Sequence, residues 1–155
     1  KAAADDILPS LGKRLDEAGV VLRGDAPTQA ILSASGIPVA AATESDWDEE
    51  YLDLVLSIKV VADTCEAINH INNHGSGHTE AIVTNNADTA KRFQTEVDAS
   101  TIFWNASTRF TDGGQFGMGA EIGISTDKIG ARGPMGLEEL TSYKWLGVAD
   151  GLIRE

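Results

Sequence analysis

Basic residues are scarce in this chain. Its 155 residues include 12 lysines and arginines against 24 aspartates and glutamates, which gives a formal net charge of -12 and an isoelectric point near 4.5. A surface of this charge repels phosphate backbones and anionic lipid headgroups. We therefore expect neither nucleic acid nor a membrane surface as a partner.

Cysteine and long apolar runs are also scarce. The single Cys65 cannot form an internal disulfide, and such usage is typical of a reducing compartment. No apolar run approaches the roughly 20 residues that a bilayer span needs, and no basic region followed by an apolar stretch opens the chain. These absences predict a cytoplasmic protein. Because the chain opens at Lys1 rather than at methionine, we expect it to be a piece of a longer protein.

The apolar residues that are present, 42% of the chain, suffice for one domain with a single core. Their spacing alternates between helical and extended periodicity. Helices are predicted over residues 7–18, 28–32, 63–75 and 86–97, and extended segments over 20–22, 37–41, 54–61, 81–84 and 101–104. Pro9 is expected to limit how far the first helix runs upstream. This order predicts an α/β fold with a mostly parallel sheet and flanking helices.

The apolar segment 54–61 is nearly continuous and rich in β-branched residues. A strand buried on both faces has this composition, so we expect it at the centre of the sheet. One helical turn over 137–140 and a last strand over 142–148 complete the prediction. Residues 1–136 then form the main part of the fold, and residues 137–155 form a segment suited to oligomerisation, whose strand is expected to dock on another domain or subunit.

Glycine is concentrated between Gly113 and Gly136, where eight of the 16 glycines lie. A solvated linker would not need the large apolar residues that accompany them, Phe110, Phe116, Met118, Ile122 and Ile124. An ordered loop region is therefore favoured, and such loops commonly carry function.

Three histidines, His70, His74 and His78, are spaced four residues apart, as metal ligands on one helical face would be. Gly75 and Gly77 break that helix before the third histidine. We therefore predict no metal site, and expect the first two histidines to flank a helix C-terminus.

Motifs for other chemistry are missing or imperfect. The glycines at 117, 119 and 123 have one residue too many for a dinucleotide-binding turn, and no amphipathic helix follows them. No G-x-S-x-G element places a serine nucleophile. Cys65 falls near a predicted helix start, but Asp63 and Glu66 oppose ionisation of its thiol, so a structural thiol is favoured. No catalytic residue is predicted within the chain.

Acidic and basic residues are concentrated in different parts of the chain. Residues 44–53 form an acidic run without a base, which is typical of a solvated face. Between Phe93 and Met135 the only bases are Arg109, Lys128 and Arg132. Cationic donors among glycine-rich loops in an acidic protein are typical of a site for a carboxylate or phosphate.

Four stretches make the chain resemble a known family. Residues 105–126 read NASTRFTDGGQFGMGAEIGIST and residues 131–145 read ARGPMGLEELTSYKW, while 49–61 and 75–84 read EEYLDLVLSIKVV and GSGHTEAIVT. They resemble the glutamate-5-semialdehyde dehydrogenases, or gamma-glutamyl phosphate reductases, of the aldehyde dehydrogenase superfamily. The resemblance covers nearly the whole chain. One departure is Gly130, where most members carry histidine.

The resemblance implies that residues 1–136 are an aldehyde-dehydrogenase-like catalytic domain that lacks the segment bearing the nucleophile. It also implies NADPH-dependent reduction of L-glutamyl 5-phosphate to L-glutamate 5-semialdehyde, with release of phosphate, in proline biosynthesis. The family's nucleophilic cysteine is expected upstream of Lys1, so this chain alone is expected to be inactive. By position, Glu50 matches a cofactor-binding glutamate. The residues that match substrate-binding loops are Asn105, Ser107, Thr108, Arg109 and Phe116. Glutamate 5-kinase is implied as pathway partner, and a homo-oligomer as the assembly of the full-length protein.

Three alternatives stay open at this point. The chain could come from another aldehyde dehydrogenase, although the Glu-x-Phe-Gly-Pro pattern of that group would need Phe and Pro at positions 52 and 54, where leucines stand. It could come from a bifunctional pyrroline-5-carboxylate synthase with a fused kinase domain. It could also be a binding or assembly module without catalysis.

Overall fold

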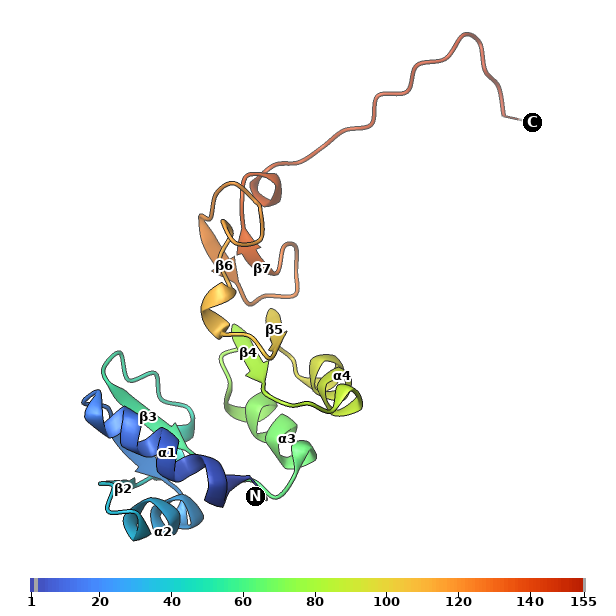
Figure 1. Cartoon of the computed structure of the whole chain (residues 1–155). Coiled ribbons are helices and arrows are strands. Elements are labelled where there is room, and N and C mark those ends of the chain that lie inside the picture. Colours follow the sequence, from blue (N-terminus) through green and yellow to red (C-terminus); the bar gives the residue numbers. More distant parts are fainter. Residues whose placement is uncertain (2, 155) are drawn as a thin grey trace.

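The computed structural model describes Lys1 and residues 3–154. The chain forms three bodies that follow one another in sequence order, and a long terminal arm leads away from the third (Figure 1). No helix in the described part of the chain is long and apolar enough to cross a bilayer.

The first body packs two helices against a small parallel sheet. Its elements are α1 (Ala4–Glu17), β1 (Val21–Gly24), α2 (Ala26–Ala34), β2 (Ala40–Ala41), the 3-10 turn η1 (Glu44–Trp47) and β3 (Val55–Ile58). The strand order is β2-β1-β3, and every pairing is parallel. The buried core consists of Leu8, Leu22, Leu32 and Ile37. Gly12 lets α1 and α2 approach closely, because a Cβ there would lie 2.6 Å from the Leu32 side chain.

The second body is a βαβ-like unit of α3 (Thr64–His74), β4 (Thr79–Ile82), α4 (Ala87–Glu96) and β5 (Thr101–Trp104). Strands β4 and β5 pair in parallel. Asp63 caps α3 by accepting from the Glu66 amide at 2.9 Å, and Asn86 caps α4 by accepting from the Thr89 amide at 2.8 Å. The two helices bury Ile68, Phe93 and Val97 between them and the strands.

The third body is the glycine-rich region, which is ordered, as expected. After the turn η2 (Thr108–Phe110), β6 (Gly123–Ser125) and β7 (Gly133–Met135) pair as an antiparallel hairpin, and η3 (Glu138–Leu140) follows. Gly113 allows the loop to close, because a Cβ there would lie 2.6 Å from the Ala120 carbonyl oxygen.

Two predictions about strands are wrong. Strand β3 lies at the edge of its sheet, and β1 is the central strand. Leu54 and Leu56, expected to be buried, are 61% and 40% exposed, since an edge strand has a neighbouring strand on one side only. Residues 142–148 form no strand, since no neighbouring strand within the described residues offers them backbone partners.

The first helix also differs from its prediction, because α1 runs from Ala4 through Pro9 instead of being limited there. Pro9 removes one backbone donor. Burial of Leu8 and Gly12 against the sheet and α2 holds the helix in place nonetheless.

Candidate functional site

The acidic run, whose composition is typical of a solvated face, contains one buried carboxylate. Asp46, in η1, is 5% exposed. Its Oδ2 accepts from the Thr43 amide at 2.6 Å and from the Thr43 hydroxyl at 2.8 Å, and Thr43 and Asp46 form a capping box around the turn. Its Oδ1 accepts from the Arg23 guanidinium of β1 and from the Tyr51 hydroxyl at 2.6 Å.

Tyr51 extends this network into the neighbouring strand. Its hydroxyl donates to Asp46 and therefore accepts from the Ser57 hydroxyl of β3, at 2.7 Å. The Arg23 guanidinium also lies 5.1 Å from the centre of the Tyr51 ring. Hydrogen bonds from Tyr51 and Thr43, with the bond from Arg23, hold the pKa of Asp46 well below its ordinary value of 3.8. The carboxylate stays ionised and fixes the segment 43–51 on the sheet.

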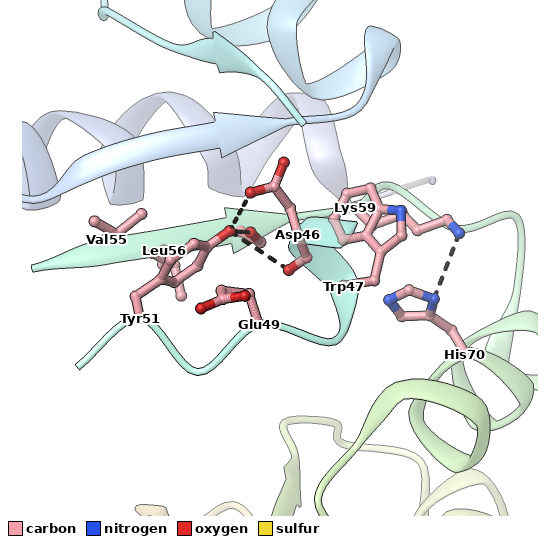
Figure 2. A pocket seen from close by; sticks show the side chains of 9 residues that line it. Asp46, Trp47, Glu49, Tyr51, Val55, Leu56, Lys59 and His70 are labelled. Carbon is pink, nitrogen blue, oxygen red and sulfur yellow. Dashed lines mark hydrogen bonds between the residues drawn. The ribbon is translucent and has the colours of Figure 1, made fainter. Parts of the chain in front are cut away.

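Beside this network lies an open pocket of about 380 Å³, shown in Figure 2. Lys59 crosses it, with its Nζ 5.3 Å from the centre of the Trp47 ring and 3.4 Å from His70 Nδ1. Partial burial, and then the charge of Lys59, lower the pKa of His70. Glu49 lines the pocket. Glu50, the predicted cofactor residue, is exposed at its border and does not line it.

The histidines occupy three different settings. The rings of His70 and His74 lie 4.6 Å apart near the end of α3, and His74 Nδ1 lies 2.8 Å from an Asp48 carboxylate oxygen. His78 lies beyond the helix, with its Nδ1 2.6 Å from the Thr79 hydroxyl. Among Lys1 and residues 3–154, no three histidine, cysteine or acidic side chains are arranged to hold a metal ion.

The second candidate region is the loop that follows β5. Asn105 has a left-handed backbone, with φ of 55°. Its side-chain amide bonds the amide and the carbonyl of Thr84, both at 2.9 Å. Asn105 therefore anchors the start of the loop to the end of β4, and both polar atoms of its side chain are used in doing so.

An open pocket of about 440 Å³ lies along this loop. Its lining comprises Ser107, Arg109, Phe110, Asp112 and Gln115. Two of the predicted substrate residues, Ser107 and Arg109, are thus brought together there. Thr108 and Phe116 are exposed outside the lining, and Asn105 acts at the base of the loop.

Threonines connect the same loop to β4. The Thr79 hydroxyl donates to the Thr111 hydroxyl at 2.9 Å, next to His78 Nδ1. Asp112 then opens a turn in which its Oδ1 accepts from the Gln115 amide at 2.9 Å and its carbonyl accepts from the Phe116 amide at 3.0 Å. The sequence interpretation missed Asp112 and Gln115. Their signal was the Asp-Gly-Gly segment, a pattern that favours an Asx-type turn.

Of the three bases expected to form an anion site, two are already paired. Lys128 and Arg132 both bond the carboxylate of Asp98, the latter at 2.8 Å, and together they lower the pKa of Asp98. Lys128 and Arg132 therefore share one carboxylate partner, which lies in the segment before β5. Arg109 has no ion-pair partner in the part of the chain that the structure describes.

Cys65 is exposed at the start of α3 rather than packed as a structural thiol. The Asn69 amide nitrogen lies 3.9 Å from its sulfur. Cys65 lines neither of the two pockets described above.

Comparison with known proteins agrees with this architecture. The model of the aldehyde dehydrogenase family matches residues 40–146. Gamma-glutamyl phosphate reductases of Escherichia coli, among them those of strains K12 / DH10B and O1:K1 / APEC, are 51% identical over 154 residues. That alignment covers 99% of the chain and 37% of each relative, so the chain spans little more than a third of their length.

Solved structures give the same result. The gamma-glutamyl phosphate reductase of Thermotoga maritima matches 100% of this chain and 36% of its own, at 49% identity and a TM-score of 0.91. The enzyme of the same name from Saccharomyces cerevisiae matches 72% of this chain and 28% of its own, at 34% identity and a TM-score of 0.53. The expected α/β, aldehyde-dehydrogenase-like fold is confirmed.

Proposed function

This chain belongs to the aldehyde dehydrogenase family, and from that premise we propose that it is part of an NADP-dependent gamma-glutamyl phosphate reductase. The full-length protein would reduce L-glutamyl 5-phosphate to L-glutamate 5-semialdehyde and release phosphate, in the cytoplasmic synthesis of proline. One observation carries the proposal: identity of 51% extends over 99% of the chain to proteins that bear this name.

Glu50 is the residue that we assign to the cofactor. Its carboxylate is exposed, and no group within the described residues bonds it. A free carboxylate accepts hydrogen bonds from vicinal hydroxyls, so Glu50 fits the ribose of a nicotinamide cofactor. When bound, such a cofactor supplies the hydride. The neighbouring Asp46–Tyr51 network supports the assignment, because it holds the backbone on either side of Glu50 in place.

The loop 105–116 is assigned to the substrate. Asn105 fixes its start, and Ser107 Oγ accepts from the Arg109 amide at 3.2 Å in the turn that presents the Arg109 side chain to the pocket. A guanidinium without a partner is suited to an anionic substrate. Thr108 and Phe116 would contact substrate from outside this lining.

Residues 137–155 are proposed to mediate assembly of the full-length protein as a homo-oligomer. Figure 1 shows the arm pointing away from the three bodies. Trp145 and Val148 are 90% and 97% exposed, which is costly for apolar side chains unless another surface covers them. Glutamate 5-kinase is the proposed pathway partner, because its product is the proposed substrate.

The decisive test runs the reverse reaction, with semialdehyde, phosphate and NADP. Three proteins are compared: this chain, its Cys65→Ser variant, and a longer protein that includes the expected upstream cysteine. We expect turnover only in the longer protein, because acyl transfer by this route needs a thiolate at the acyl carbon. Turnover by the short chain that disappears in Cys65→Ser would overturn the assignment of the nucleophile. A longer protein without activity would overturn the proposed function.

A further inference from the structure

Arg109 and Asp112 line one pocket with opposite charges, yet they form no ion pair with each other. Elsewhere in the chain opposite charges meet directly, as Arg23 does with Asp46 and as Lys128 and Arg132 do with Asp98. A pocket that keeps a cation and an anion apart is suited to a ligand that carries both charges.

The Asp112 carboxylate is held so that one oxygen serves the protein and the other is available. Its Oδ1 accepts from the Gln115 amide at 2.9 Å, whereas no bond to Oδ2 occurs within the described residues. The turn is buttressed from behind, since the Met118 amide donates to the Gly113 carbonyl at 2.8 Å and the Gly113 amide donates to Glu121 at 2.7 Å. Asp112 is therefore positioned by the fold before any ligand arrives.

The other lining groups suit a short amino acid. Ser107 offers a hydroxyl, Gln115 an amide, and Phe110, 49% exposed, an apolar ring against which a methylene chain can pack. The pocket of about 440 Å³ has room for a small ligand.

We propose that this pocket recognises the α-amino-acid end of the substrate as a zwitterion, with Asp112 accepting from the α-ammonium group while Arg109 binds the α-carboxylate. This inference rests on the proposed function and adds to it a residue that determines specificity. A glutamyl compound with a free amine is then preferred over one whose amine is acylated, because the amide lacks the charge that Asp112 requires.

The test uses the full-length reductase that contains this segment, in the reverse reaction with phosphate and NADP. The substrates are glutamate 5-semialdehyde and its N-acetyl derivative. For each substrate separately, kcat/KM of the variant is compared with kcat/KM of the wild-type enzyme. Asp112→Asn keeps an oxygen that can accept from the Gln115 amide, so the turn is preserved. We expect kcat/KM for the free amine to fall by about 10- to 100-fold, which is the loss of a charge-assisted hydrogen bond. The value for the acetylated substrate should stay the same.

Asp127→Asn is the matched control, because Asp127 is an exposed aspartate of the same glycine-rich region outside the pocket lining. It should change neither value. An equal fall for both substrates in Asp112→Asn would show a structural role and overturn the inference, as would no fall for either, while the proposed function stands. A wild-type enzyme that oxidises neither substrate would overturn the proposed function and the inference together.

Discussion

The segment 43–51 and the loop 105–116 both expose charged side chains to an open pocket, and they differ in how those charges are used. In the first, the Asp46 carboxylate accepts hydrogen bonds from Arg23, Thr43 and Tyr51, so its charge is satisfied within the protein. In the second, Arg109 and Asp112 are left without an ion-pair partner among the described residues. A satisfied network stabilises the fold, whereas unsatisfied charges at a pocket are available to a ligand. The two regions should therefore respond to mutation in opposite ways.

The largest expected effect is on catalysis at the second loop. In the proposed full-length reductase, Arg109→Ala should lower kcat/KM by about 10- to 100-fold, the loss of a charge-assisted hydrogen bond to the substrate, and leave the thermal midpoint nearly unchanged. Steady-state kinetics and a thermal unfolding scan measure the two quantities. Lys128→Ala is the control, because that lysine already pairs with Asp98. An unchanged kcat/KM in Arg109→Ala would contradict the assignment of the loop to substrate.

A smaller effect, on stability, is expected at the first segment. Tyr51→Phe removes the hydroxyl that donates to Asp46 and accepts from Ser57, so the free energy of unfolding should fall by about 2 kcal/mol in denaturant titrations. Tyr143→Phe, at a tyrosine that is 86% exposed, should change it by less than about 0.5 kcal/mol. Equal effects of the two substitutions would show that the network does not stabilise the fold.

Glu50→Gln, in the same segment 43–51, should affect cofactor binding rather than stability. The Glu50 carboxylate has no partner within the described residues, so its loss should raise KM for NADP without a comparable loss of stability. The nucleophilic cysteine that is expected upstream of Lys1 should keep its reactivity toward thiol reagents. Unchanged cofactor kinetics would make Glu50 a surface charge only.

These contrasts also explain which features the sequence could predict. The caps of α3 and α4 were predictable, because Asp63 and Asn86 bond amides only three residues away. The ion pairs of Asp46 and Asp98 were not, since Arg23 lies 23 residues from Asp46 and Lys128 lies 30 residues from Asp98. Local patterns carry no information about such pairs. The sequence therefore could not single out Asp46 within the acidic run, or Arg109 among the three bases.

The same limit applies to strands. The apolar pattern of residues 54–61 correctly predicts a strand, but composition cannot decide whether a strand lies at the centre or the edge of its sheet, because that depends on which other strands pair with it. The resemblance to a family, by contrast, pointed to Ser107 and Arg109, and both residues line one pocket. Asp112 was not predicted, because a site for an anionic ligand was expected to contain only basic side chains.

The smallest expected effect concerns Glu80, a half-buried carboxylate on β4 that forms no ion pair with any of the described residues. Burial raises its pKa above the ordinary value of 4.5. Between 4.5 and the raised pKa, the folded protein holds a proton that the unfolded chain has released, so this group lowers stability as pH rises through that window. At neutral pH the cost is present in full, and below about pH 4.5 it vanishes because both states are protonated.

Glu80→Gln, which is neutral at every pH, should therefore raise the thermal midpoint of the full-length reductase slightly at pH 7 and leave it unchanged at pH 4. A lower midpoint at pH 7 would mean that Glu80 has a partner in the rest of the protein, and would move it into the class of satisfied charges to which Asp46 belongs.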